Sequence, residues 1–111
     1  MTTPTLGTFE LSTLLTVARL GEDAYGLAIR RDLAQRTERE PSAGAIYTTL
    51  QRLEDKGLLT SRASAPLPVR GGRSRRYYAL TGAGARALRD AERAAASLWA
   101  GVGLSLPSGR V

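Results

Sequence analysis

Apolar residues near the start of the chain recur at helical spacing, on more than one side of the predicted helix. Thr8 is a suitable N-cap for this helix and Gly21 a suitable end. The apolar residues between them are Phe9, Leu11, Leu14, Leu15, Val17, Ala18 and Leu20. A short helix that is apolar almost all round needs two partners. We expect one to be its own domain and the other a second subunit, contacted through Leu11, Leu14 and Leu15.

A second helical pattern follows and ends at a sharp break in the chain. Asp23 is a suitable N-cap for a helix that runs to about Thr37. Its apolar stripe has the spacing i, i+4, i+8 and consists of Tyr25, Ile29 and Leu33. Pro41 then disfavours helical geometry for the residue before it. The chain must therefore turn after the second helix.

Ser42 directly follows this break and is a suitable N-cap for a third helix, which runs to about Lys56. Gly57 is positioned to adopt the left-handed conformation that ends many helices. The residues predicted to be buried on this helix are Ile46, Leu50 and Leu53. The two helices and the break between them predict a helix-turn-helix.

The opposite side of the third helix is polar and mostly uncharged. It carries Gly44, Thr48, Gln51 and Asp55, flanked by Tyr47 and Arg52. Such a face suits base edges and phosphate oxygens in the major groove of DNA. A solvated helix surface without a ligand has the same character, so both interpretations stay open. The candidate DNA-binding residues of this helix are Ser42, Gly44, Tyr47, Thr48, Gln51 and Arg52.

Residues 58–63 and 74–80 have the composition of two short strands. A hairpin with a proline- and glycine-bearing loop directly after a helix-turn-helix predicts a wing. Alternation along the second strand places Tyr78 and Leu80 in the core, leaves Tyr77 more exposed, and turns Arg75 and Arg76 to opposite sides. The candidate DNA-binding residues of the wing are Arg70, Gly71, Gly72, Arg73, Arg75 and Arg76.

The last helical pattern begins near Thr81, and its apolar residues follow steps of three and four. These residues are Leu88, Ala91, Ala95, Leu98 and Val102. The spacing predicts a dimerisation helix over residues 81–102, with residues 103–111 as a flexible tail. Trp99 lies beside this seam and has two interpretations: an anchor in the dimer interface or core, or a stacking wall for a planar effector between subunits.

The positive charge of the chain is concentrated in one segment. The net charge is +6, and residues 56–89 contain eight basic residues and no acidic residue. These basic residues are Lys56, Arg62, Arg70, Arg73, Arg75, Arg76, Arg86 and Arg89. A basic segment on an otherwise neutral or acidic body is typical of a surface that binds a polyanion.

The composition excludes several other classes of protein. The chain has no cysteine and no histidine, which removes disulfides, thiolate nucleophiles, imidazole bases and nearly all zinc or copper sites. The remaining polar residues form no recognisable catalytic spacing, so we expect neither an enzyme nor a cofactor. No apolar run reaches the length of a membrane helix and the first residues lack a secretory pattern. We therefore expect a cytoplasmic protein of one domain.

Three strings of this sequence resemble the PadR family of bacterial transcriptional regulators in its short form. They are LGTFELSTLLTVARLGEDAYGLAIRRDL, EPSAGAIYTTLQRLEDKGLLTSR and RGGRSRRYYALTGAGARAL, which together span about residues 6–89. The resemblance implies a winged helix domain, a homodimer held by the first and last helices, palindromic operators, and repression that a small molecule relieves. It also implies that Tyr47 lies at the DNA backbone, and that the wing motif comprises Gly71, Gly72, Arg73, Arg76, Tyr77 and Tyr78.

Pattern and resemblance together predict a mainly α fold with a small β-hairpin wing (α+β). Residues 1–80 form the winged helix-turn-helix, followed by the C-terminal dimerisation helix. The leading hypothesis is a homodimeric repressor that binds double-stranded DNA and responds to a small aromatic effector. The rival hypothesis is a winged helix that binds an acidic protein through its basic segment, without binding DNA.

Overall fold

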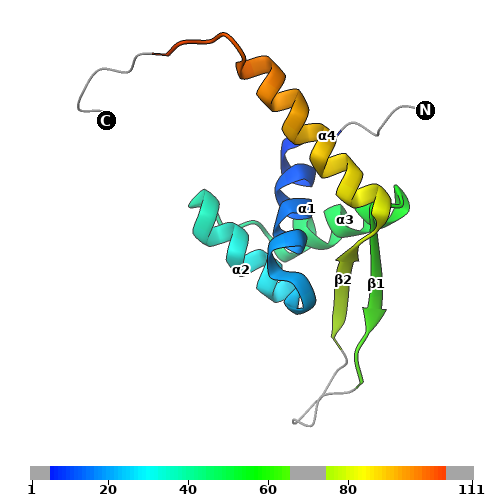
Figure 1. The fold of residues 1–111 in the computed structure, drawn as a ribbon. Coiled ribbons are helices and arrows are strands. Elements are labelled where there is room, and N and C mark those ends of the chain that lie inside the picture. Colours follow the sequence, from blue (N-terminus) through cyan, green and yellow to red (C-terminus); the bar gives the residue numbers. More distant parts are fainter. Residues whose placement is uncertain (1–5, 66–74, 105–111) are drawn as a thin grey trace.

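The computed structural model of the chain describes residues 6–65 and 75–104. In these residues it contains α1 (Thr8–Leu20), a 3₁₀ turn η1 (Gly21–Asp23), α2 (Gly26–Thr37), α3 (Ala43–Asp55), β1 (Leu59–Ala63), β2 (Arg76–Leu80) and α4 (Gly82–Trp99). The helices gather at one end and the hairpin extends from them (Figure 1). The predicted fold class, mainly helical with a small hairpin wing, is confirmed.

Two helix starts follow from a hydroxyl side chain that replaces a missing backbone partner. The Ser42 hydroxyl accepts a hydrogen bond from the Ala45 amide at 3.0 Å, and the Thr81 hydroxyl accepts one from the Gly84 amide at 3.0 Å. The predicted N-cap Ser42 is confirmed, and the last helix begins next to Thr81, as predicted. The first helix differs by one residue, because its N-cap is Gly7 and not Thr8. The Glu10 carboxylate accepts a hydrogen bond from the Gly7 amide at 3.0 Å.

The start of the second helix was predicted wrongly. Asp23 belongs to η1, and α2 begins at Gly26 with Tyr25 as its N-cap. The reason is a contact with the hairpin. The Tyr78 amide donates a hydrogen bond to the Ala24 carbonyl at 2.8 Å, and Tyr25 pairs with Tyr77 as an isolated antiparallel bridge. This pairing holds residues 24 and 25 in a non-helical conformation and ties the wing to the helix-turn-helix.

The core lies where α1, α2, α3 and the base of the hairpin meet. The predicted apolar residues of α3 are buried there together with Ile29, Leu33 and Tyr78. Among the residues that the structure describes, the buried apolar ones are Leu14, Val17, Ala24, Ile29, Leu33, Ile46, Leu50, Leu53, Leu58, Leu59, Tyr78 and Ala87. Their removal from water is the main force that holds the elements together.

Leu14 is a correction to the predicted dimer interface. Its side chain is 0% exposed, because it is part of the core of its own subunit. A side chain without accessible surface cannot contact a second chain. Leu11 is half-buried and Leu15 is 43% exposed, so these two neighbours remain available.

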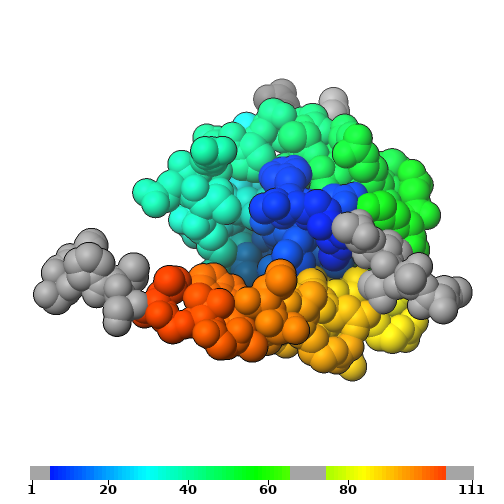
Figure 2. All heavy atoms as spheres, turned by 90° about the horizontal axis from the view of Figure 1, so that it is seen from above, coloured from blue at the N-terminus to red at the C-terminus, as the bar shows by residue number. Residues whose placement is uncertain are grey.

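The antiparallel hairpin has a register that pairs Leu59 with Leu80 and Ala63 with Arg76. α4 is docked at the base of this hairpin. The Thr81 hydroxyl donates a hydrogen bond to the Gly57 carbonyl at 2.6 Å, and the Thr81 amide donates one to the Leu58 carbonyl at 3.1 Å. α1 lies between α4 and the helix-turn-helix (Figure 2).

Val102 is a second correction, because α4 ends at Trp99 and leaves this residue outside the helix. Gly101 adopts a φ of 79°, a left-handed conformation that does not continue a right-handed helix. The predicted seam therefore ends one step earlier, at Leu98. Within the described residues, no helix combines the length and apolar character needed to cross a membrane.

Candidate nucleic-acid interface

The polar face predicted on the third helix is exposed. α3 packs on α1 and α2 through its buried residues, which turns its opposite side to solvent. Every candidate residue of this helix is exposed, and the side chain of Tyr47 is 53% exposed. The exposed face consists of Ser42, Gly44, Tyr47, Thr48, Gln51, Arg52 and Asp55.

Tyr47 reaches from α3 across to the start of α2. Its ring lies so close to Gly26 that a Cβ atom on that residue would be 2.8 Å from the ring atoms Cε1 and Cζ. Real Cβ atoms do not approach other atoms within 3.0 Å. The absence of a side chain at residue 26 therefore allows Tyr47 to take this position at the edge of the exposed face.

Gln51 and Asp55 are joined on the same face. The Gln51 Nε2 atom donates a hydrogen bond to Asp55 Oδ1 at 2.9 Å. An ionised carboxylate only accepts hydrogen bonds, so the Gln51 amide nitrogen must face Asp55. Asp55 thus holds the Gln51 amide in one orientation, with its Oε1 acceptor and one remaining N–H available to a ligand.

Lys56 is less available for a polyanion than the sequence indicated. Its Nζ atom forms an ion pair with Glu10 at 2.8 Å and joins the end of α3 to the start of α1. The hydrogen bond from Lys56 lowers the pKa of the Glu10 carboxyl below its usual value, assisted by the bond from the Gly7 amide. The positive charge at this position is therefore largely neutralised within the subunit.

Arg76 lies on the side of the hairpin that faces α3. Its Nη1 atom donates a hydrogen bond to the Ser61 hydroxyl at 3.0 Å, and that hydroxyl donates one to Glu54 of α3 at 2.7 Å. Tyr78 shares this side, where burial raises the pKa of its hydroxyl group. Arg76 and Ser61 thus connect the hairpin to Glu54 of α3.

Arg75 and Arg62 lie with two tyrosines on the other side of the hairpin. The Arg75 guanidinium lies 4.3 Å from the centre of the Tyr25 ring, and the Arg62 guanidinium lies 5.1 Å from the centre of the Tyr77 ring. The two rings are tilted by 60° with their centres 5.5 Å apart. A hydrogen bond to Tyr77 raises the pKa of Arg75. The prediction that Arg75 and Arg76 face opposite sides agrees with these contacts.

Tyr25 was not among the candidates from the sequence. The helical spacing of Tyr25, Ile29 and Leu33 suggested an ordinary apolar stripe, and no local pattern shows that Tyr25 contacts a residue of the hairpin. Arg62 was recognised only as part of the basic segment. The tip of the wing, with Arg70, Gly71, Gly72 and Arg73, lies outside the described residues, so these predictions stay untested.

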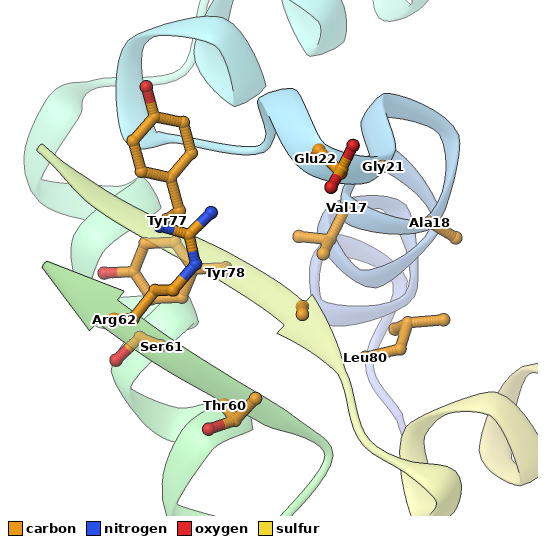
Figure 3. A pocket seen from close by; sticks show the side chains of 11 residues that line it. Val17, Ala18, Gly21, Glu22, Thr60, Ser61, Arg62, Tyr77, Tyr78 and Leu80 are labelled. Carbon is orange, nitrogen blue, oxygen red and sulfur yellow. The ribbon is translucent and has the colours of Figure 1, made fainter. Parts of the chain in front are cut away.

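A groove of about 570 Å³ lies between the end of α1, η1 and the hairpin. Val17 and Ala18 line its helical wall, while Arg62 and Tyr77 line the hairpin side (Figure 3). Glu22 also lines the groove. The groove therefore has apolar walls and charged groups of both signs.

A second exposed surface is apolar and lies on α1 and α4. The side chains of Leu98 and Trp99 are 81% and 62% exposed. Ala95 is also exposed, Ala91 is half-buried, and Leu88 packs partly against the core. Large apolar side chains gathered at one helix end are typical of a surface that another chain covers.

The helix-turn-helix and the adjoining hairpin with exposed arginines define a winged helix-turn-helix protein. The sequence model of the PadR-like family of transcriptional regulators matches residues 14–90. The chain belongs to this family. Membership implies DNA binding, and the family is one of regulators and not of enzymes.

Several solved structures of this family are similar to the chain. A PadR family regulator from Eggerthella lenta is 34% identical, with a TM-score of 0.65 and coverage of 86% of this chain and 84% of that chain. One from hypervirulent Clostridium difficile is 29% identical, with a TM-score of 0.64 and coverage of 79% and 88%. A PadR-like regulator from Bacillus cereus, at 24% identity, shares the fold with a TM-score of 0.67 and coverage of 83% and 84%. None of the curated proteins compared matches the chain.

Proposed function

We propose that the chain is a sequence-specific repressor that binds a palindromic operator as a homodimer. The observation that carries this proposal is the exposed polar face of α3 beside a hairpin that bears arginines. Two copies of α3, related by a two-fold axis, enter successive major grooves about 34 Å apart. Repression then follows from occupation of a promoter by the dimer.

The residues of α3 have distinct roles in this proposal. Thr48 and Gln51 reach base edges, because they occupy the middle of the exposed face. Tyr47 and Arg52 flank that face and contact phosphates. Asp55 orients the Gln51 amide, so that its acceptor oxygen and remaining N–H can pair with the two matching groups on the edge of an adenine.

The homodimer in this proposal is formed by α1 and α4. Leu15, Leu98 and Trp99 have large exposed apolar side chains, which a second copy would remove from water. Leu11, Leu88, Ala91 and Ala95 complete this surface. A Leu98→Asp variant is therefore expected to sediment as a monomer and to lose affinity for a full operator, whereas its affinity for a half-site should be unchanged.

A small planar aromatic molecule is the proposed effector, stacked on Trp99. The chain has one tryptophan, so its fluorescence reports on this position alone. Quenching that saturates with ligand, accompanied by release of DNA, would support the effector. Failure of a diverse panel of planar compounds to quench the fluorescence would leave Trp99 as a residue of the dimer interface only.

Selection of bound duplexes from a random pool tests the proposed function. We expect a palindrome whose half-sites are separated by about one helical turn. The selection should be repeated with Gln51→Ala, which is expected to change the preferred base pair at one position per half-site. An Arg89→Ala variant serves as a control, because it removes one positive charge from α4 and none from α3 or the hairpin. Recovery of no preferred sequence would contradict the proposal.

A further inference from the structure

The wing and the start of α2 are connected by stacked side chains. Arg62, Tyr77, Tyr25 and Arg75 form this stack, in which each guanidinium lies over a ring and the two rings contact each other. Arg75 is exposed, and the Tyr25 ring lies 4.3 Å from its guanidinium. The stack therefore restricts the exposed Arg75 side chain, because its guanidinium rests against the Tyr25 ring.

The position of Tyr25 is determined by its own backbone geometry and by backbone pairing with β2. Tyr25 is the N-cap of α2 and has extended backbone geometry. Its bridge to Tyr77, together with the bond from the Tyr78 amide to Ala24, ties this residue to β2. The Tyr25 ring therefore has little freedom to move with the Arg75 side chain. It limits the positions that the Arg75 guanidinium can take.

The stack is linked to α3 through the start of α2. Tyr25 precedes Gly26, and Gly26 is the residue over which Tyr47 lies. Arg75 contacts the Tyr25 ring, and the ring of Tyr47 lies against the next residue along the chain, Gly26. Arg75 and Tyr47 are therefore linked through two consecutive residues at the start of α2.

We infer that Tyr25 is a positioning residue for DNA binding, which holds the Arg75 guanidinium between the hairpin and the start of α2, where it pairs with a phosphate. This inference rests on the proposed function. An arginine that is already oriented loses less conformational freedom when it binds. Tyr25 therefore contributes to affinity through Arg75 and makes no contact with DNA itself.

A double-mutant cycle with duplex DNA tests this inference. Tyr25→Leu removes the ring and should weaken binding about three- to tenfold for specific and random duplexes alike, the range expected for a cation–π contact. Tyr25→Phe keeps the ring and should bind within about twofold of the wild type. Arg75→Ala should weaken binding at least as much as Tyr25→Leu. In the Arg75→Ala background, Tyr25→Leu should have no further effect.

The salt dependence of binding separates positioning from a merely structural effect. Loss of one phosphate contact per subunit should reduce the log–log salt slope of the dimer by about 2 in Tyr25→Leu. A slope equal to that of the wild type, or additive effects of the two substitutions, would overturn the inference. So would a Phe variant as weak as the Leu variant. Failure of the wild type to bind any duplex would instead overturn the proposed function, and the inference with it.

Discussion

The ring of Tyr47 on α3 lies against the backbone of Gly26 at the start of α2. This contact joins the two helices of the helix-turn-helix at the edge of the exposed face of α3. Gly26 has no positive φ, so conformational freedom is not what the position requires. It requires space for the tyrosine ring.

Gly26→Ala is therefore expected to displace Tyr47 without unfolding the protein. The ring is at the end of a rotatable side chain and can move, while alanine favours the helix by up to about 1 kcal/mol relative to glycine. We expect unchanged or higher stability in urea, and about tenfold weaker DNA binding if Tyr47 donates a hydrogen bond to a phosphate. In a Tyr47→Ala background the same substitution should leave DNA affinity unchanged. A further loss of affinity there would contradict this role of the contact.

Gly84→Ala should have the opposite effect and destabilise the fold. A Cβ atom at Gly84 would overlap the backbone carbonyl oxygen of Leu58, which cannot rotate away. We expect a loss of about 2–3 kcal/mol in the free energy of unfolding, as for other overpacked sites. Gly82→Ala is the matched control, because its Cβ would lie 3.5 Å from Arg86 Nη1, an ordinary contact. Equal stability of the two variants would refute the close approach of α4 to Leu58.

Asp55→Ala should strengthen binding to random DNA and weaken discrimination between sequences. The carboxylate lies on the same face as Gln51 and repels phosphates, so its removal should raise affinity for any duplex severalfold at low salt. Its loss also frees the Gln51 amide to rotate. Glu92→Ala on α4 removes the same charge from an exposed site elsewhere and serves as the control. If Asp55→Ala kept the full sequence preference of the wild type, Asp55 would not orient Gln51.

Acid should weaken the link between α1 and α3. The hydrogen bond from Lys56 lowers the folded-state pKa of Glu10 below the ordinary value of 4.5. A carboxylate with a depressed pKa contributes stability that is complete above its unfolded pKa and is lost as the pH falls through its folded pKa. Urea midpoints of the wild type should therefore fall more between pH 5 and about pH 3 than those of Glu10→Gln. Parallel curves for the two proteins would contradict this contribution.

The sequence predicted best the features that depend on neighbouring residues. Ser42 was recognised as an N-cap, and its hydroxyl accepts a hydrogen bond from the amide three residues later. The start of the last helix near Thr81 was also recognised. The buried stripe of α3 followed from helical spacing in the same way. The ion pair between Lys56 and Glu10 joins residues 46 positions apart, which no local pattern indicates.

The errors at Leu14 and Val102 have the same origin, because both predictions relied on the spacing of apolar residues alone. α1 is apolar on several sides, and spacing alone does not distinguish the side that faces its own core, where Leu14 lies, from the side that stays exposed. In α4 the apolar spacing continues to Val102, although Gly101 ends the helix before it. The place of Tyr25 was missed because its partner Tyr77 lies in the hairpin, far along the chain.

The dependence of DNA affinity on salt tests the central claim most directly, because it measures phosphate contacts without knowledge of the operator. If each subunit contacts about three to five phosphates, the log–log slope for the dimer should be about −5 to −9. The measurement uses the wild-type chain with a duplex recovered by selection, or with random duplex where none is recovered. A slope near zero would contradict the account, since the arginine-bearing surface would then not bind DNA.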